Sequence, residues 1–380
     1  MRVVHVIIGL NVGGAELMLQ RLVGSFRDDA AQEHFVISLT DLGKVGPLLQ
    51  KQGINVSTMG MRGVYDIPKV MYKLYRFFRQ KQPDIVQTWM YHADLIGGVA
   101  ARLAGIRSVI WGIRTTDVGG GVSRVTGLIR KVCAALSSKV PRVIVCAAEA
   151  SRKAHVNIGY DNSKMIVIPN GFHPEALTAT TEERNAIRAA ALFAPGDLVV
   201  GSLGRYNPDK DHENFVRAAL LLCADSPNVK FLLVGRDLNR DNKTLVSLIE
   251  AAGYSERFVL LGERRDVAAC LKAMDIFCLH SRTEGFPNVL GEAMTVGLPC
   301  VATHVGDAAF LLGDAGIVVE PENYEALAEG LRRLIALNHN ERVALGDKAR
   351  QRVHDNFTMD CAKARFTTVY EQISASKEFH

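Results

Sequence analysis

The sequence predicts an α/β protein made of two Rossmann-like domains, each with a doubly wound parallel sheet. Apolar runs rich in β-branched residues recur along the chain and alternate with helical patterns, as expected for parallel sheets that helices cover on both faces. The 380 residues are too many for one ordinary hydrophobic core. We place the first domain at 1–171, a linker rich in Ala, Thr, Glu and Pro at 172–196, and the second domain at 197–356.

In the first domain, strand and helix patterns follow one another without a break. Pro68 fits the first turn of a helix, and Gly105 fits the position just after one. The expected strands are 3–8, 34–40, 55–59, 85–89, 108–113, 142–147 and 165–168, and the expected helices are 15–27, 46–53, 67–82, 92–104, 123–138 and 150–158.

The second domain repeats this alternation. Its expected strands are 198–203, 230–234, 258–261, 276–279, 300–302 and 317–319, and its expected helices are 212–223, 288–297, 324–336 and 341–354. One more amphipathic helix, 357–373, follows it.

Composition narrows the class of protein. The chain is 48% hydrophobic and 22% charged and holds no apolar run of 18 residues, which excludes a membrane-spanning helix. Its start runs directly into a strand and lacks a small-residue cleavage site, so we interpret it as part of the first domain. Seven scattered cysteines without a Cys-x-x-Cys motif suit a reducing, cytoplasmic compartment.

Charge is distributed unevenly along the chain. Residues 1–170 hold 22 basic and 11 acidic side chains, and residues 171–380 hold 23 and 29. A basic first half favours an anionic partner there, such as an acidic lipid, a lipid-linked pyrophosphate or a nucleic acid.

The segment from Ser281 to Met294 carries the clearest functional signal. It reads as the end of a buried strand, a turn broken by Gly285 and Pro287, and a helix capped by Asn288. Amides 288–290 should then point out of the helix N-terminus, where a pyrophosphate would be held. The carboxylates of Glu284 and Glu292 accept hydrogen bonds only, which suits sugar or ribose hydroxyls.

The string Glu284-Gly-Phe-Pro-Asn-Val-Leu-x-Glu292-Ala-Met resembles the Glu-x7-Glu signature of the retaining family-four glycosyltransferases. This resemblance, which covers nearly the whole chain, implies the glycosyltransferase-B fold, in which two Rossmann-like domains face a cleft. It also implies that the helix 357–380 packs back on the first domain and that neither cofactor nor metal is required. Within the string, the resemblance implies that the donor is bound by Glu284, Gly285, Phe286, Asn288, Val289, Leu290 and Glu292.

Further matches lie after other strands. Gly13-Gly14 follows the first strand, and His92 follows the strand 85–89. The resemblance implies that the glycines face the donor diphosphate and the acceptor and that His92 lies near the donor sugar; alone, the glycines would equally fit a tight turn. Arg114-Thr-Thr-Asp117 and three glycines at 119–121 suggest a loop over the same sheet edge.

Two cations follow the first strand of the second domain. Arg205 and Lys210 flank one turn and could reach one pair of phosphates; the resemblance implies that they clamp the leaving diphosphate. Asp209-Lys-Asp211 matches the Asp-x-Asp metal motif of another fold, but we interpret it as a helix start. The resemblance further implies that Gly262, Arg264 and Arg265 lie near the base.

The expected helix 67–82 combines basic and aromatic residues. It carries Lys69, Lys73, Arg76, Arg79 and Lys81 together with Tyr72, Tyr75, Phe77 and Phe78. This pattern fits a surface that contacts anionic membrane lipids, and it also fits a helix whose apolar face is core. We expect Leu74 and Phe78 to be core, and the exposed remainder to lean on the inner leaflet.

These observations predict an enzyme that moves a sugar from a nucleotide-diphosphate sugar, a UDP-sugar by preference, to an acceptor hydroxyl with retention of configuration. Arg205, Lys210, His92 and Glu284 are the expected catalytic residues. The expected acceptor is a lipid-linked saccharide of a surface polysaccharide or glycan, with a small soluble acceptor as the alternative and no nucleic acid partner.

Three other functions stay open. They are a nucleotide-sugar epimerase or hydrolase, a nicotinamide dehydrogenase, and a non-catalytic nucleotide-sugar-binding partner in polysaccharide assembly. The dehydrogenase lacks support because no Gly-x-Gly-x-x-Gly fingerprint follows a strand.

Overall fold

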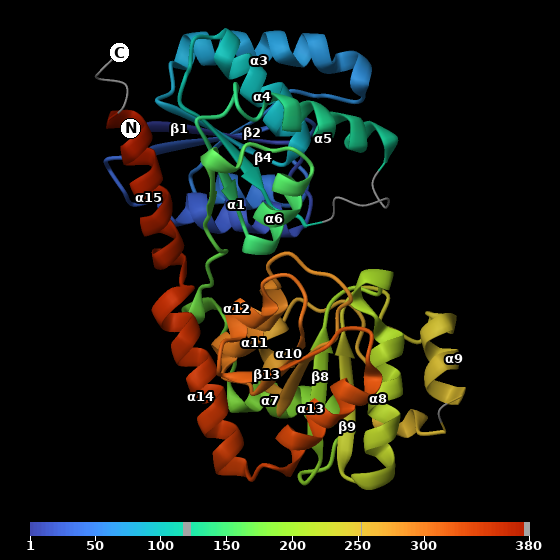
Figure 1. Ribbon diagram of the computed structural model, residues 1–380. Coiled ribbons are helices and arrows are strands. Elements are labelled where there is room, and N and C mark those ends of the chain that lie inside the picture. The colour runs from blue at the N-terminus through green and yellow to red at the C-terminus, as the bar shows by residue number, and fades with distance from the viewer. Residues whose placement is uncertain (117–122, 252, 376–380) are drawn as a thin grey trace. The chain divides into compact units, whose positions relative to one another are not determined.

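The computed structural model (Figure 1) describes residues 1–116, 123–251 and 253–375, and the chain forms two compact units. Unit 1 holds Met1–Gly171 and the chain from Met359 onward, and unit 2 holds Phe172–Thr358. Residues 172–196, the predicted linker, belong to unit 2 and include helix α7 (Thr181–Ala190).

Unit 1 is built on a seven-stranded sheet in the order β3-β2-β1-β4-β5-β6-β7, in which every strand pair is parallel. Val4 of β1, for example, is opposite Phe35 of β2 and Val86 of β4. The strands are β1 (Arg2–Ile7), β2 (Glu33–Ser38), β3 (Asn55–Thr58), β4 (Ile85–Trp89), β5 (Val109–Ile113), β6 (Val143–Cys146) and β7 (Met165–Val167).

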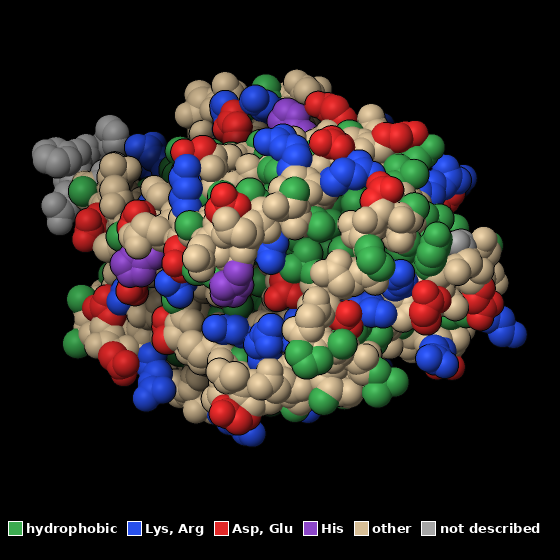
Figure 2. All heavy atoms as spheres, turned by 90° about the horizontal axis from the view of Figure 1, so that it is seen from below, with side chains coloured by type: hydrophobic (Ala, Val, Ile, Leu, Met, Phe, Trp, Pro, Cys, Tyr) green, Lys and Arg blue, Asp and Glu red, His purple; other side chains and the backbone are tan. Residues whose placement is uncertain are grey.

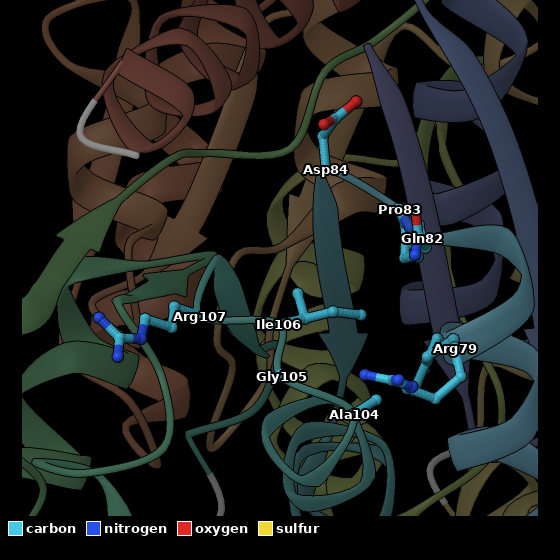
Figure 3. Close-up of a pocket in the computed structure, with 9 residues that line it drawn as sticks. Arg79, Gln82, Pro83, Asp84, Ala104, Gly105, Ile106 and Arg107 are labelled. Carbon is cyan, nitrogen blue, oxygen red and sulfur yellow. The ribbon is translucent and has the colours of Figure 1, made fainter. Parts of the chain in front are cut away.

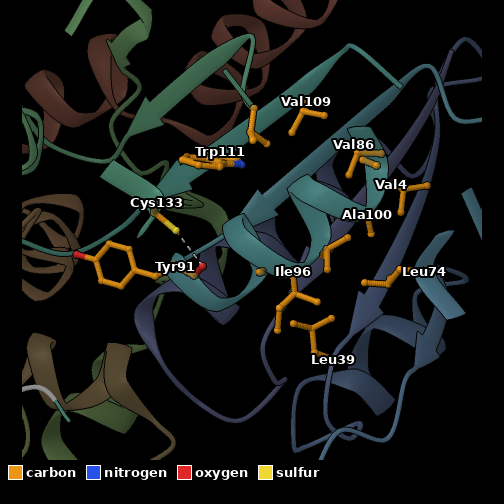
Figure 4. Packing of buried hydrophobic residues seen from close by; sticks show 14 of the residues in the cluster. Val4, Leu39, Leu74, Val86, Tyr91, Ile96, Ala100, Val109, Trp111 and Cys133 are labelled. Carbon is orange, nitrogen blue, oxygen red and sulfur yellow. Dashed lines mark hydrogen bonds between the residues drawn. The ribbon is translucent and has the colours of Figure 1, made fainter. Parts of the chain in front are cut away.

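Helices cover both faces of this sheet. Val4 and Val6 of β1 pack with α3 and α4, whereas Val3 and Ile7 pack with α1 and α15. Figure 4 shows the first of these two clusters, and Figure 1 shows α3, α4 and α5 on one side of the strands and α1 on the other. The helices are α1 (Gly14–Ser25), α2 (Gly46–Lys51), α3 (Ile67–Lys81), α4 (Tyr91–Leu103), α5 (Arg124–Leu136), α6 (Glu149–Asn157) and α15 (Met359–Ala375).

Unit 2 has a six-stranded sheet in the order β10-β9-β8-β11-β12-β13, again with parallel pairs throughout. Buried residues of α8, α9 and α13 pack on one of its faces. The strands are β8 (Leu198–Leu203), β9 (Val229–Val234), β10 (Phe258–Leu260), β11 (Ile276–Leu279), β12 (Cys300–Thr303) and β13 (Gly316–Val319). Besides α7, the helices are α8 (His212–Asp225), α9 (Lys243–Ala251), α10 (Val267–Lys272), α11 (Asn288–Val296), α12 (Ala308–Leu312), α13 (Tyr324–Ala336) and α14 (His339–Asn356).

Two parallel-sheet α/β units confirm the predicted fold class. In each sheet the strand order changes direction once, between β1 and β4 in unit 1 and between β8 and β11 in unit 2. Open parallel sheets bind ligands outside the carboxyl ends of the strands at such a switch point. The loops after these four strands are therefore where a site is expected.

None of the described helices is both long and apolar enough to cross a bilayer. On the face of the molecule in Figure 2, basic and acidic side chains are interspersed and no large patch of one sign forms.

Candidate functional site

In unit 2, hydrogen bonds and an ion pair connect the loop after β8 to the loop after β11. The strands are neighbours, with Ile276 opposite Val200. The backbone amide of Arg282 donates to the carbonyl of Asp209 at 2.7 Å, and that of Thr283 reaches the same oxygen at 3.4 Å. The side chain of Arg282 adds an ion pair with Asp211 at 3.0 Å. Residues 209–211 and 281–284 thus hold each other in place at the switch point.

Lys210 and Glu284, both predicted as catalytic, meet where these two loops are connected. Lys210 lies at the end of the short helix η4 (Pro208–Lys210), and its Nζ is 2.5 Å from Glu284 Oε1. The hydroxyl of Ser281 donates to the same carboxylate oxygen at 2.7 Å. Both side chains are largely buried, at 22% and 13% exposed. The cation predicted for phosphate and the carboxylate predicted for a hydroxyl therefore neutralise one another.

Arg205 lies in the loop after β8 and is exposed. Among the residues that the structure describes, its guanidinium has no hydrogen-bond or ion-pair partner, so it can accept an anion without breaking a contact.

The helix start at α11 differs by one residue from the prediction. Pro287 occupies the N-cap and Asn288 is the first helical residue, so the prediction of Asn288 as the cap is wrong. Proline fits there because a cap position needs no backbone donor. The amide of Leu290 donates to the carbonyl of Pro287 at 3.1 Å and is engaged within the helix, contrary to its predicted role. Amides 288 and 289 stay as candidates, and Glu292 is half-buried in the second turn.

Phe286 supports the turn and does not offer its ring to a ligand. It is 7% exposed, and its centroid lies 6.2 Å from that of Phe172 and 6.0 Å from that of Phe357. The Leu290 side chain is fully buried, Val289 is half-buried, and Gly285 accepts the amide of Asp307 at 2.9 Å. The predicted donor contacts of the Phe286 and Leu290 side chains are therefore not available in this structure.

The predicted base-side residues lie after β10. Gly262 is buried; its amide donates to Leu238 and its carbonyl accepts from Gly235, both at 2.8 Å, so its backbone is not open to a base. Arg264 is exposed and pairs with Asp266 at 2.5 Å, and Arg265 is exposed.

Two glycines that shape the site carry no obvious signal in the sequence. A Cβ on Gly235 would lie 1.7 Å from the carbonyl oxygen of Gly204, and one on Gly306 would lie 2.3 Å from that of Gly285. Both have positive φ, +149° and +54°. They let the loops after β9 and β12 press against the loops that carry Arg205 and Glu284. In the sequence, Gly235 is marked only by its place directly after a predicted strand, and Gly306 only by its place in a short loop.

In unit 1, Gly13 and Gly14 stand at the start of α1, directly after the β1 loop. Gly13 is the N-cap, and a Cβ there would lie 2.4 Å from Oε2 of Glu16. The Glu16 carboxylate folds back over this turn, and burial raises its pKa. Gly14 is exposed. The turn can therefore admit a ligand at the Gly14 backbone, while Glu16 shields Gly13.

His92 lies in the first turn of α4, after β4. It is half-buried, and burial lowers its pKa, so the imidazole is neutral near pH 7. Met90, the N-cap, has φ +70° and ψ 161°, a conformation otherwise used by glycine. Met90 donates to the carbonyl of Gly112 at 2.8 Å and accepts from the amide of Asp94 at 2.9 Å.

Asp94 fixes the same turn from beneath. Its carboxyl is fully buried, accepts from Thr88 Oγ1 at 2.5 Å and from the Gly112 amide at 3.4 Å, and has its pKa raised by burial. The turn that presents His92 is thus tied to both β4 and β5. Arg114 lies at the end of β5, donates to Asn170 at 2.9 Å and stacks over Trp89. Asp117 and the glycines 119–121, predicted as a loop over this edge, lie outside the described residues.

Two cavities in the units lie away from these loops. One of about 420 Å³ in unit 1 opens between the C-terminal ends of α3 and α4, with Phe78, Arg79, Asp84 and Ile106 among its lining (Figure 3). Another of about 700 Å³ in unit 2 borders β10 and α9. None of the predicted site residues lines either cavity.

Within the described part of the chain, no group of three or more His, Cys, Asp or Glu side chains is arranged to hold a metal ion. Asp209 is exposed, and Asp211 pairs with Arg282 and stands at the N-cap of α8.

Family models match both units. Residues 12–176 match the model described as Glycosyltransferase Family 4, and residues 183–352 match Glycosyl transferases group 1. The chain belongs to glycosyltransferase family four. The resemblance predicted from the Glu284–Glu292 string is therefore confirmed. This glycosyltransferase is 26% identical to the Escherichia coli UDP-Gal:alpha-D-GlcNAc-diphosphoundecaprenol alpha-1,3-galactosyltransferase, over 70% of each chain. It is 24% identical, over 82% of each, to the Staphylococcus aureus capsular polysaccharide biosynthesis glycosyltransferase CapM.

Solved structures share its fold. Anabaena HepE in complex with UDP and glucose superposes with a TM-score of 0.83 at 22% identity, covering 98% of this chain and all of that one. WaaG, a glycosyltransferase involved in lipopolysaccharide biosynthesis, gives 0.70 at 17% identity, covering 97% and 99%. These neighbours confirm the glycosyltransferase-B fold.

Proposed function

We propose that this glycosyltransferase transfers a sugar from a UDP-sugar to an acceptor hydroxyl with retention of configuration and without a metal ion. The observation that carries the proposal is the clustering of Arg205, Lys210, Glu284 and the α11 N-terminus on the loops at the unit 2 switch point. These groups combine positive charge for a diphosphate with carboxylates for hydroxyls. The name of the E. coli relative, which contains UDP-Gal, and the UDP bound to HepE support the choice of nucleotide.

The demanding part of the reaction is the departure of the diphosphate. Negative charge grows on its oxygens as the glycosidic bond breaks, and preorganised cations and amides stabilise that charge most effectively. Arg205, Lys210 and amides 288 and 289 supply them in unit 2. Loss of one such donor should slow transfer roughly 10²–10³-fold, as for oxyanion-hole deletions.

The two glutamates bind hydroxyls in this proposal. Glu292 accepts from the ribose and Glu284 from the donor sugar. Glu284 is not a nucleophile: the acceptor attacks from the face that the diphosphate leaves, and the diphosphate takes the acceptor proton.

Titration calorimetry with UDP, GDP, ADP and NAD, each with and without EDTA, tests the donor site. We expect UDP to bind most tightly, with an affinity that EDTA does not change and that Glu292→Gln weakens. A preference for GDP would change the nucleotide and keep the fold and chemistry. Binding that needs a metal, or binding of NAD alone, would contradict the proposal, as would an unchanged UDP affinity in Glu292→Gln.

Product analysis without acceptor tests the alternative enzymes. Free sugar or an isomer formed from the UDP-sugar would indicate a hydrolase or an epimerase instead.

We propose a lipid-linked saccharide as the acceptor, in bacterial surface polysaccharide synthesis on the cytoplasmic face of the membrane. The names of the E. coli and S. aureus relatives support this choice. So does the basic first half of the chain. All seven cysteines are free thiols, which suits a reducing compartment.

The outer face of α3 supports membrane contact. Val70, Leu74 and Phe78 face the core, and α3 contains no acidic residue. On the opposite side, one stripe at spacings of three and four residues is exposed; it begins with Tyr65, two residues before α3, which is 96% exposed, and includes Tyr72 at 61%. We call it the outer stripe; it consists of Tyr65, Lys69, Tyr72, Arg76 and Arg79. Cations beside tyrosines suit the interface of an anionic bilayer.

Sedimentation with anionic liposomes tests the outer stripe. The parent protein should pellet at low salt and release as salt rises, because the attraction is screened. Lys69→Glu/Arg76→Glu/Arg79→Glu should abolish pelleting, since each cation contributes about 1 kcal/mol near an anionic surface. The control with the same charge change is Lys131→Glu/Lys139→Glu/Lys153→Glu, at exposed positions off α3. A parent that stays in the supernatant, or equal losses in both variants, would exclude this contact.

A further inference from the structure

His280 lies between the two loops of the unit 2 site and has no role in the chemistry proposed above. It follows β11 directly, is 2% exposed, and contacts the loop after β8. We propose that His280 is a positioning residue that holds the Lys210 backbone in register with the Glu284 loop, and so aims the Lys210 ammonium at the leaving diphosphate. This inference rests on the proposed function of Lys210.

The hydrogen bonds of His280 determine which ring nitrogen carries the proton. Nδ1 lies 2.5 Å from the carbonyl oxygen of Lys210, and a carbonyl can only accept, so Nδ1 carries the hydrogen. Nε2 then accepts from the hydroxyl of Ser202 on β8, 2.7 Å away. One ring therefore connects β8, the end of η4 and the start of the Glu284 loop.

The position of this contact matters because it engages the backbone carbonyl of Lys210, which neither the η4 turn nor the ion pair with Glu284 engages. Its amide donates to Asn207 within the η4 turn, and its ammonium pairs with Glu284, a contact that a phosphate would have to compete with. On either side, the Asp209 carbonyl and the Asp211 carboxylate are bound by Arg282. The bond from His280 remains when the ammonium turns toward a ligand, so the backbone of Lys210 does not move with it.

The environment of the ring keeps it neutral. His280 packs against His212 at 5.0 Å and Phe215 at 4.7 Å between ring centroids. Burial, followed by the nearby His212, lowers the pKa of His280 well below its usual value. A neutral ring can both donate to Lys210 and accept from Ser202, whereas a protonated one would lose the second bond and place a second cation beside the Lys210 ammonium.

Two substitutions separate the two bonds. In His280→Asn the amide nitrogen can take the place of Nδ1 and keep the bond to Lys210, while the Ser202 hydroxyl loses its acceptor. In His280→Gln the amide reaches the place of Nε2 and keeps Ser202, while the Lys210 carbonyl loses its donor. Each variant leaves one buried polar group without a partner, so the two should lose similar stability.

The experiment compares kcat and KM for the UDP-sugar in these variants, with thermal unfolding as the check on folding. We expect His280→Asn to stay within about threefold of the parent in kcat and His280→Gln to lose about 10–100-fold, the usual cost of removing a supporting contact. In a Lys210→Ala background His280→Gln should have almost no further effect, because the residue it positions is gone. Equal kcat values for Asn and Gln, or fully additive losses with Lys210→Ala, would overturn the inference.

A second measurement uses the parent enzyme and does not depend on variants that fold. The ¹⁵N shifts of His280 should report the neutral form protonated at Nδ1; protonation at Nε2 instead would exclude the bond to Lys210. Failure of the proposed function has a different signature: the parent would bind no nucleoside diphosphate, or Lys210→Ala would bind it as tightly as the parent.

Discussion

Lys210 and Glu284 form an ion pair with each other in the structure. In the proposed reaction they have separate partners: Lys210 binds the diphosphate, and Glu284 binds a hydroxyl of the donor sugar. The 2.5 Å pair is mostly buried, and the Ser281 hydroxyl adds a second contact to the same carboxylate oxygen. A donor diphosphate must therefore draw Lys210 away from Glu284 or share it. The pair keeps a buried cation compensated until substrate arrives, at the expense of some donor affinity.

This competition predicts opposite effects of Glu284→Gln on binding and on transfer. Without the carboxylate, Lys210 is free for phosphate, so UDP should bind about fivefold more tightly, equivalent to roughly 1 kcal/mol. Transfer should fall at least tenfold because the donor-sugar hydroxyl loses its charged acceptor. Calorimetry and initial rates measure the two effects. Glu329→Gln, an exposed change of the same charge on α13, should alter neither, and weaker UDP binding in Glu284→Gln would contradict the competition.

For individual residues, the sequence identified the residue types at the site but not the contacts between them. The Glu284–Glu292 spacing and the Arg205–Lys210 turn are local patterns and could be recognised directly. The contact of Lys210 with Glu284 joins residues far apart in the chain and depends on β8 and β11 being neighbours. Phe286 was expected to contact the ligand, but its ring is instead buried against Phe172 and Phe357, because burial of an aromatic ring is strongly favourable.

Among the elements, the start of α4 stores backbone strain beside His92. Met90 has φ +70° and is held there by hydrogen bonds at both its amide and its carbonyl. Non-glycine residues in this region carry a cost of about 1–3 kcal/mol. The Gly112 backbone and the buried Asp94 impose this turn, and His92 is presented by it.

Met90→Gly and Met90→Ala separate this strain from side-chain packing, because both remove the same side chain. Gly should be more stable than Ala here by about 1 kcal/mol or more, since only Gly adopts this backbone without strain. Urea unfolding measures the difference. At the exposed helical position Ala186 the order should reverse, with Ala186→Gly costing about 1 kcal/mol. Ala more stable than Gly at position 90 would show that the turn relaxes.

Long apolar strands and amphipathic helices were the predictable elements, since their residues repeat one pattern over a whole segment. The helices α9, α10 and α12 were not predicted, and they have only 9, 6 and 5 residues. Such short helices are stabilised by the elements they pack on, here neighbouring helices or the sheet, and not by their own pattern. The one-residue shift at α11 has a similar origin, because Asn288 has the intrinsic preference for a cap but the turn places Pro287 there.

For the whole molecule, several neutral buried histidines predict sensitivity to acid. Burial lowers the pKa of His34, His155 and His212 from 6.5 to about 4. The unfolded chain therefore takes up protons as the pH falls below about 6.5, whereas the folded protein does not until about 4. The free energy of unfolding is fully retained above pH 6.5 and falls toward pH 4, by roughly 2 kcal/mol at pH 5 for each histidine.

Urea midpoints at pH 7 and pH 5 test this dependence. A marked fall is expected in the parent and a smaller fall in His34→Gln, which lacks one of the three groups. His354→Gln removes an exposed histidine and should leave the parent's pH dependence unchanged. Equal midpoints at the two pH values would contradict the assignment of neutral buried rings.

The presence of two parallel-sheet α/β domains was predictable from the sequence because strand and helix patterns alternate regularly. The strand order was not, although it decides which loops meet. Only the structure places β1 beside β4 and β8 beside β11, and so brings Gly13, His92, Lys210 and Glu284 to the switch points of their own sheets.

Unit 2 interrupts unit 1 in the chain, and this has a consequence for synthesis on the ribosome. Helix α15 completes the cover of one face of the first sheet. Its Phe366 and Tyr370 are buried in the core of unit 1, and the Tyr370 hydroxyl donates to Gln87 at 2.5 Å. Residues 172–358 emerge before that helix exists, so the nascent first unit waits with one face of its sheet covered only in part, by α1, while the second unit already has all its strands. N-terminal domains usually fold first during translation; in this chain the later unit is the first that can finish.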